Sequence, residues 1–332
     1  MTKIEAARQE YKDWSRMMGV DTLSRLNETL SEGKGTWLIN LCEARQERKY
    51  VEAADAICGS GKRIILMSGP SSSGKTSSSL RIAQQCRVLG VFPRVLELDN
   101  YFVEREKTPR DENGDFDFEA LGAMNTDLLQ ENIRDLLAGK EVVLPRFDFK
   151  EGRTFFDESR RVKMAPNELL FMEGIHALNP ALLPDIDRSQ VFYIYISALS
   201  ALNPGLVELS HNSTTDKRLL RRIVRDNRVR GISPEDNILR WPSVRRGEQR
   251  NIFPYEENAD VVFNSSTLYD VPLLKYYAEP LLHAVSESSP AYEKAQALLD
   301  FLDKVTALKP AEIAVIPPTS IMREFIGGQI LV

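Results

Sequence analysis

Cysteine and histidine are both scarce in this chain, with three of each among 332 residues. Cys42, Cys58 and Cys86 are odd in number and widely spaced, which excludes a disulfide framework and the paired spacing of zinc or redox sites. We therefore expect reduced thiols in a cytoplasmic protein. The histidines form no zinc pattern either, so we expect them to be surface or packing residues.

The chain also lacks a long hydrophobic run and an excess of positive charge. Its longest nearly apolar segment, residues 191–202, is too short to span a membrane and suits a central strand. Residues 1–16 are charged throughout, which is not typical of a secretory signal. The net charge of −5 argues against general binding to nucleic acid. We expect a cytoplasmic protein with neither a membrane nor a nucleic acid as partner.

Residues 69–76, with the sequence GPSSSGKT, fit the pattern G-x-x-x-x-G-K-[ST] of a phosphate-binding loop, or P-loop. The flanking residues predict a strand that enters the loop and a helix that leaves it, which is the context the pattern requires. In such loops backbone N–H groups face the phosphates, the lysine reaches the outer phosphates, and the last hydroxyl binds Mg²⁺. The alternative is an ordinary glycine/serine turn. The predicted nucleotide-binding residues are Gly69, Ser71, Ser72, Ser73, Gly74, Lys75, Thr76 and Ser77.

Short apolar segments alternate with helical patterns from residue 61 onward, which predicts an α/β fold with a mainly parallel sheet flanked by helices. In such sheets ligands bind at the carboxyl ends of the strands. The predicted strands are 62–68, 94–98, 141–144, 168–173, 190–196 and 260–264.

The chain divides into a helical N-terminal segment, 1–60, and a P-loop domain, 61–332. Within the second we expect a small hairpin or lid-like insertion at 153–166, an arginine-rich lid at about 213–250, and a helical part at about 270–332.

Two acidic residues stand at predicted strand ends. Asp99 ends one strand and opens a loop, where a carboxylate can accept a proton from a substrate hydroxyl; the alternative is a turn aspartate that caps the loop. Glu173 ends another strand, where nucleotide-binding folds place an acidic residue near the metal; the alternative is a glutamate that faces solvent. Together with the P-loop, three strand ends carry reactive groups.

Residues 213–230 predict a basic helix, in which arginines 218, 221, 222 and 225 recur at three- and four-residue spacing and so share a face. Guanidinium groups suit phosphate oxygens and stabilise charge that moves during phosphoryl transfer. We interpret this helix as a lid over the phosphates; the alternative is a solvated charged face. A second helix is predicted from Ser233, with Ser233 as N-cap and Pro234 at its first position.

The order of these motifs resembles the uridine kinase and phosphoribulokinase family of P-loop kinases, over nearly all of the chain from residue 60. Residues 98–102 (LDNYF) resemble the family's segment with a catalytic aspartate and aromatic residues. Residues 116–119 (FDFE) resemble the stretch in which an aspartate binds the ribose hydroxyls, and 144–149 (LPRFDF) the segment that places an aromatic ring on the pyrimidine. Residues 171–175 (FMEGI) resemble the EGI signature.

The resemblance implies ATP and Mg²⁺ as cofactors and gives the residues roles. Asp99 is expected to be the catalytic base, and the charge of the transferring phosphoryl group is expected to be balanced by Lys75, Arg225 and Arg230. Thr76 and Glu173 are expected to hold the metal. The residues expected to hold the nucleoside are Phe102, Asp117, Phe147 and Arg222.

A closer resemblance is to a bacterial subgroup of uridine kinase-like proteins, carried by the P-loop and by residues 173–180 (EGIHALNP), 241–266 and 323–328 (REFIGG). Its members often carry N-terminal domains that resemble the TGS and editing regions of threonyl-tRNA synthetase. No such domain is evident in this chain, so we expect a kinase domain or a natural short form. The sequence suggests no role for the REFIGG segment.

Two positions depart from the family pattern. A histidine that reads the exocyclic group of the pyrimidine in uridine/cytidine kinases is missing, and Gly152 stands where it would be expected. Ile232 replaces the last arginine of the lid. The phosphate-binding residues are therefore better supported than the identity of the base.

We expect ATP-dependent phosphorylation of the 5′-hydroxyl of a pyrimidine nucleoside such as uridine or cytidine, in pyrimidine salvage. The resemblance also implies a homo-oligomer. One alternative is a kinase of the same fold for thymidine or another nucleoside, pantothenate or a sugar phosphate; another is an ATP-dependent regulatory module associated with RNA. A GTPase is disfavoured, because the D-x-x-G match at residues 111–114 lies in a polar loop and no strand ends in a guanine-reading NKxD.

Overall fold

The computed structural model of the chain describes residues 1–110, 114, 116–200 and 213–331. Of the D-x-x-G match at residues 111–114, only Gly114 belongs to the described residues. His211 lies outside the described residues. The three cysteines are free thiols. Within the described part of the chain, none of the helices combines the length and the apolar character that crossing a bilayer needs.

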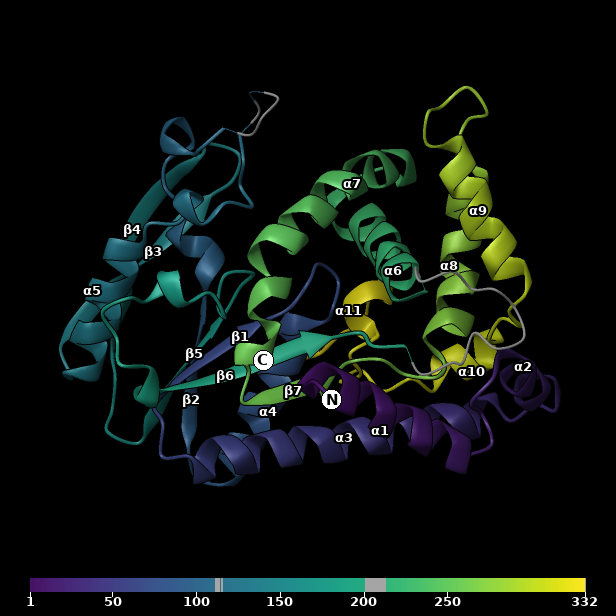
Figure 1. The fold of residues 1–332 in the computed structure, drawn as a ribbon, viewed down its shortest axis with the longest axis horizontal. Helices are drawn as coiled ribbons and strands as arrows, with labels where there is room; N and C mark the ends of the chain where they lie inside the picture. The colour runs from purple at the N-terminus through teal and green to yellow at the C-terminus, as the bar shows by residue number, and fades with distance from the viewer. Residues whose placement is uncertain (111–113, 115, 201–212, 332) are drawn as a thin grey trace.

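A five-stranded sheet forms the centre of the molecule, with strand order β2-β5-β1-β6-β7 (Figure 1). All four pairings between neighbouring strands are parallel. Every residue of β1 and β6 is buried, as in strands that are covered on both faces. The predicted α/β fold is therefore confirmed. The strands are β1 (Ile64–Ser68), β2 (Phe92–Glu97), β5 (Glu168–Glu173), β6 (Val191–Ser197) and β7 (Val261–Asn264).

Helices cover both faces of this sheet. On one face α3 (Gly35–Gly59) and α4 (Lys75–Val88) pack side by side, and their apolar residues join a buried cluster with Ile65 and Phe171 of the sheet. On the other face α5 (Thr126–Leu137) contributes to a cluster that includes Leu66 and Met172. α1 (Lys3–Met17) contacts β7 at the edge of the sheet. The N-terminal helices α1 and α3 thus pack directly on the sheet.

A third apolar cluster joins the two ends of the chain. Leu26 and Leu30 of α2 (Leu23–Ser31) belong to the same buried cluster as residues of the last third of the chain. Figure 1 shows these later helices beside and above the sheet. Besides α1 and α3, the helices that share the cluster with α2 are α6 (Ser213–Arg230), α7 (Pro234–Asn251), α8 (Asp270–His283), α9 (Tyr292–Asp303), α10 (Pro310–Ala314) and α11 (Arg323–Ile326).

The predicted start of α7 is confirmed, because the Ser233 side chain accepts a hydrogen bond from Asp236 N and Pro234 occupies the first turn. Short 3-10 helices connect the other elements. They are η1 (Leu98–Tyr101), η2 (Arg105–Lys107), η3 (Leu121–Ala123), η4 (Pro180–Leu182), η5 (Arg188–Gln190) and η6 (Phe253–Asn258).

One predicted strand of the central sheet lies elsewhere. β3 (Glu141–Asp148) pairs antiparallel with β4 (Arg153–Lys163) in a separate two-stranded sheet. Residues of β3 mostly alternate between buried and exposed, whereas a strand inside the parallel sheet is buried on both sides. The hairpin predicted at 153–166 therefore consists of β3 and β4 together, at the side of the molecule near α5 (Figure 1).

Candidate active site

A cavity of about 300 Å³ opens at the carboxyl ends of β1, β2 and β5. The P-loop follows β1, Asp99 follows β2, and Glu173 ends β5, so the three predicted strand ends meet in this cavity. Side chains from α6 and α7 cover it. The sequence-predicted residues that line it are Ser71, Ser72, Gly74, Lys75, Thr76, Asp99, Glu173, Arg222, Arg225 and Arg230.

Two glycines allow the P-loop to fit tightly against the rest of the molecule. A Cβ atom at Gly69 would lie 2.0 Å from the carbonyl oxygen of Ile196, so the backbone of β6 leaves no room for a side chain. Gly74 has φ +83°, and a Cβ there would lie 2.5 Å from Cδ1 of Ile321. Both pattern glycines are thus required by close packing, and at Gly74 also by the left-handed backbone.

The side chains of Lys75 and Thr76 lie at the cavity. Lys75 Nζ donates to the carbonyl oxygens of Gly69 at 2.9 Å and Pro70 at 3.3 Å. Thr76 Oγ1 donates to Glu173 Oε1 at 2.8 Å, while Glu173 Oε2 is buried with no hydrogen-bond partner among the described residues. A hydroxyl beside a carboxylate with an unused oxygen is a donor set that suits Mg²⁺. Thr76 and Glu173 therefore fit the predicted metal site.

The two acidic residues at strand ends have raised pKa values. Asp99 is exposed at the cavity, and desolvation by the surrounding protein raises its pKa, while the nearby Lys75 and Arg230 charges partly oppose the shift. Burial raises the pKa of Glu173 to about 7, against the lowering effect of Lys75 and of the Thr76 hydroxyl. A carboxylate whose pKa is raised is a better proton acceptor, which suits Asp99 to the role of a base.

Three arginines of the α6 segment face the cavity and share one carboxylate. Asp226, which is completely buried, forms ion pairs with Arg222 Nε at 3.4 Å, Arg225 Nε at 2.8 Å and Arg230 Nη1 at 3.4 Å. Arg222 Nη1 also donates to the Ser71 hydroxyl at 2.9 Å. One buried acid thus holds three cations at the cavity wall. The sequence predicted roles for the arginines, and for Asp226 only that it offsets part of their charge.

The other two arginines on this face are structural. Arg218 is 2% exposed and forms a bidentate ion pair with Glu248 of α7, at 2.5 and 2.8 Å, and it donates to Ser71 O at 3.0 Å. The same Glu248 accepts a hydrogen bond from Ser71 N at 2.9 Å. The lid prediction is therefore inaccurate for Arg218, which supports the P-loop from behind.

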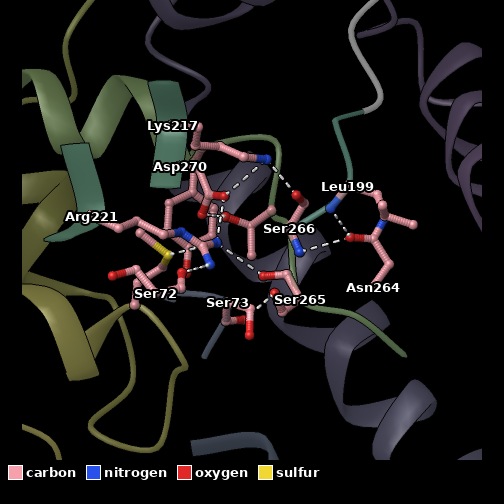
Figure 2. A network of polar contacts seen from close by, with 12 residues as sticks. Ser72, Ser73, Leu199, Lys217, Arg221, Asn264, Ser265, Ser266 and Asp270 are labelled. Atoms are coloured by element: carbon pink, nitrogen blue, oxygen red, sulfur yellow. Dashed lines mark hydrogen bonds and ion pairs between the residues drawn. The ribbon is translucent and has the colours of Figure 1, made fainter. Parts of the chain in front are cut away.

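Arg221 has a similar supporting role, as Figure 2 shows. Its guanidinium lies 2.6 Å from Asp270 Oδ2 and 3.0 Å from the carbonyl oxygen of Ser265, and it reaches Ser72 O at 3.5 Å. Ser265 in turn donates to Ser73 O at 2.5 Å. The backbone of the P-loop is held by side chains from helices and loops that lie far along the chain.

Three residues predicted to hold the nucleoside do not line the cavity. Phe102 and Phe147 are buried and pack together with Phe118 and Phe149, with ring centroids 5.1–6.2 Å apart in the contacting pairs. We call these four residues the aromatic cluster. Phe147 N donates to Asn100 Oδ1 at 3.3 Å, which joins the cluster to the η1 segment that carries Asp99.

Asp117 lies in a neighbouring small pocket of about 30 Å³ between its own loop and α7. Glu119, two residues later, lines both that pocket and the main cavity. Burial, and then the proximity of Glu248, raise the pKa of Glu119 to about 7. A Cβ at Gly247 of α7 would come within 2.9 Å of the Glu119 side chain, so this helical glycine makes room for it. The sequence placed Asp117 at the site and missed Glu119.

The position of the missing family histidine is filled by a neighbour. Gly152 has φ +70°, and a Cβ there would lie 2.7 Å from Cβ of Arg105. The Arg105 guanidinium donates to the carbonyl oxygens of Phe149 and Lys150, at 2.5 and 3.1 Å. A side chain at position 152 is therefore excluded by both backbone conformation and space.

Comparison with known proteins gives the family. A model of the phosphoribulokinase / uridine kinase family matches residues 64–272, more than half of the chain. The chain belongs to this family. The phosphoribulokinase / uridine kinase family is one of kinases, and membership confirms the predicted resemblance at that level without specifying the acceptor. The narrower resemblance to proteins with threonyl-tRNA synthetase-like domains stays a prediction.

Individual relatives share only modest sequence identity with this chain. Uridine kinase from Staphylococcus aureus (strain JH9) is 28% identical over 200 residues, which cover 60% of this chain and 86% of that protein. The uridine kinase of the Newman strain matches to the same extent. Among solved structures, a possible uridine kinase from Bacillus stearothermophilus is 20% identical, with a TM-score of 0.40, covering 64% of this chain and 98% of that one.

Proposed function

We propose that this member of the phosphoribulokinase / uridine kinase family transfers a phosphoryl group from ATP to the 5′-hydroxyl of a pyrimidine nucleoside such as uridine or cytidine. The observation that carries the proposal is the meeting of Asp99 with Lys75, Thr76 and Glu173 in one cavity. A base, a P-loop lysine and a metal-binding pair are the parts that phosphoryl transfer to an alcohol requires.

Each group of cavity residues has its own role in the proposed reaction. Asp99 orients the acceptor hydroxyl and takes its proton as the hydroxyl oxygen attacks. Lys75, Arg225 and Arg230 balance the charge that spreads over the phosphoryl oxygens, which is the main source of catalysis in this chemistry. Thr76 and Glu173 would hold Mg²⁺, which when bound would neutralise part of the negative charge of the ATP phosphates.

On the acceptor side, we propose that Arg222 contacts the nucleoside from the cavity wall, with Asp117, Phe102 and Phe147 as further contacts. Glu119 joins them, because it reaches the cavity that Asp117 does not line. A carboxylate is a good acceptor for the hydroxyls of a sugar. We also propose that the protein forms a homo-oligomer, and this part of the proposal is supported by the family resemblance alone.

A kinase of the same fold for another acceptor is the second candidate. It is favoured by Gly152, where Arg105 excludes the side chain that reads the pyrimidine in ordinary uridine/cytidine kinases. Thymidine or another nucleoside, pantothenate and a sugar phosphate are the acceptors to compare.

The test is an ATP-consumption assay on a panel of acceptors, with each product identified by mass. The panel contains uridine, cytidine, thymidine, deoxyuridine, adenosine, pantothenate and ribulose 5-phosphate, and the Asp99→Asn variant serves as the control for background hydrolysis. We expect a pyrimidine nucleoside 5′-monophosphate as the main product. No turnover on any acceptor despite ATP binding, together with RNA binding that weakens steeply with salt, would favour the regulatory, RNA-associated alternative.

A further inference from the structure

The C-terminal REFIGG segment lies against the P-loop. Ile321, 2% exposed, packs where Gly74 has no side chain, and Phe325 is completely buried beneath the Arg221 guanidinium, 4.9 Å from its ring centroid. Arg228 of α6 donates to the carbonyl oxygens of Glu324 and Phe325, both at 3.3 Å. The backbone of α11 is therefore held between the lid helix and the nucleotide-binding loop.

This packing brings the Glu324 carboxylate to the first turn of α4. Glu324 Oε2 accepts hydrogen bonds from the Ser77 hydroxyl at 2.5 Å and from Ser77 N at 3.3 Å, and it lines the main cavity. Gln329 Nε2 donates to the same hydroxyl at 2.7 Å. The free N–H groups and the positive dipole end of a helix form an anion site, which in a P-loop receives phosphate. Glu324 thus places a carboxylate where a phosphate group is expected.

Glu248 is a useful comparison, because it also accepts a hydrogen bond from a P-loop N–H. Glu248 is 1% exposed and is neutralised by Arg218 and Arg245, so it is part of the permanent support of the loop. Glu324 is partly exposed and has no ion-pair partner anywhere in the described residues. Its negative charge is one of those that raise the pKa of Glu173, so it lies close enough to oppose a further negative charge in the cavity.

We propose that Glu324 is an internal anion that occupies the phosphate-binding end of α4 and is displaced by ATP, so that the C-terminal segment responds to nucleotide occupancy. The inference rests on the proposed use of ATP and goes beyond it. Only the side chain has to rotate, since the buried Ile321 and Phe325 keep the backbone of α11 in place. Loss of the Glu324 contact also removes one of the two groups that hold the Ser77 hydroxyl, which loosens the contact with Gln329.

The test measures binding of ATP and of adenosine by calorimetry to the full chain and to the Glu324→Gln variant. Removing a like charge beside the phosphates is expected to tighten ATP binding by roughly tenfold and to leave adenosine binding unchanged. Glu287→Gln, an exposed site in the turn before α9, removes the same charge elsewhere and should bind ATP as the unmodified protein does. Glu324→Ala serves as a second variant if the glutamine side chain keeps the contact with Ser77.

Hydrogen exchange provides the second readout. Addition of ATP to the unmodified protein is expected to speed amide exchange in residues 327–331, and the Glu324 variants should show faster exchange there without ATP. Unchanged or weaker ATP binding by both Glu324 variants would overturn the inference and leave the proposed function intact. Absence of ATP binding by all of these proteins would overturn the proposed function, and the inference with it.

Discussion

In the P-loop region, Lys75 and Thr76 form hydrogen bonds of 2.9 and 2.8 Å to groups that line or border one cavity, whereas in the aromatic cluster four phenylalanines pack on one another and none lines it. In the first region the loop backbone is fixed, and the Glu324 carboxylate lies at the first turn of α4. The second is a cluster of rings, of which Phe102 and Phe147 are buried and Phe149 is exposed, next to the segment that carries Asp99. Phosphate binding is therefore expected to need only the rotation of side chains such as Glu324, while acceptor binding is expected to need a change in how the rings pack.

The difference follows from the kind of group that does the binding. Phosphates are held by backbone N–H groups, whose positions are fixed once Gly69 and Gly74 allow the loop to pack. In the proposed function, an acceptor would be held by side chains from three separate segments, which include Phe102, Asp117 and Phe147. A site formed by backbone N–H groups tolerates little change in its geometry. A site formed by side chains can change its specificity through single substitutions.

The largest expected effect separates chemistry from binding. Asp99→Asn should lower kcat by about 10²–10⁴-fold, because the amide cannot take the proton of the acceptor hydroxyl, while calorimetry should show little change in ATP affinity. Asp117→Asn, at a carboxylate outside the main cavity, is the matched control and should act mainly on the KM for the acceptor. Near-normal turnover by Asp99→Asn would contradict the role of Asp99 as base.

The ion pair between Arg218 and Glu248, which supports the P-loop, can be removed without changing a cavity residue's role in catalysis. Arg218→Met leaves the buried Glu248 without its main cation and should lower the free energy of unfolding by about 3–5 kcal/mol, as urea denaturation measures. The exposed pair of Arg134 and Asp185 is the control, and Arg134→Met should cost less than about 1 kcal/mol. Equal losses in the two variants would mean that the buried pair does not support the loop.

A substitution in the aromatic cluster is expected to have a smaller effect, and only on the KM for the acceptor. Phe147→Leu nearly conserves volume and removes a ring, so the KM for a nucleoside should rise by roughly tenfold, the value of a stacking contact, with the KM for ATP unchanged. Phe156→Leu, on the exposed side of the same hairpin, should leave both KM values as they are. A Phe147→Leu effect on the KM for ATP would show that the two regions are coupled.

The smallest expected effect is on the pH dependence of stability. Burial raises the pKa of Glu119 in the folded protein to about 7 from its ordinary value of 4.5. Between these pH values the folded state keeps a proton that the unfolded state has lost, so the free energy of unfolding falls as the pH rises. Glu119→Gln should therefore flatten the decrease of Tm between pH 5 and pH 7.

Glu151→Gln, at an exposed turn of the β3–β4 hairpin, should keep the slope of the unmodified protein. An unchanged slope in Glu119→Gln would show that Glu119 is not the group that titrates in this range.

Much of the phosphate region could be predicted from the sequence, because its signals are contiguous. The P-loop occupies eight adjacent residues, and the apolar runs of β1, β5 and β6 read directly as buried strands. The error at β3 has a physical reason. The apolar stretch at residues 142–144 is compatible with the central sheet or with a hairpin, and only its partner strand decides between them.

The supports of the loop could not be predicted in the same way. Ser71 and Glu248 are 177 residues apart in the chain, and Ser77 and Glu324 are 247 apart. A glutamate within a charged helix looks the same in the sequence whether it faces solvent or a buried backbone N–H. The mid-helix Gly247 was the available signal for Glu119, since glycine inside a helix is costly unless something needs the space.

The contact between Gly74 and Ile321 has a consequence for the synthesis of the protein. Translation delivers the chain from its N-terminus, so the P-loop leaves the ribosome long before Glu248, Ser265 and Ile321 exist. The loop is among the first segments to be made and among the last to be completed. A nascent chain that stops short of residue 320 presents the motif without the Ile321 contact, so the loop is expected to pack fully only after residue 321 has been made.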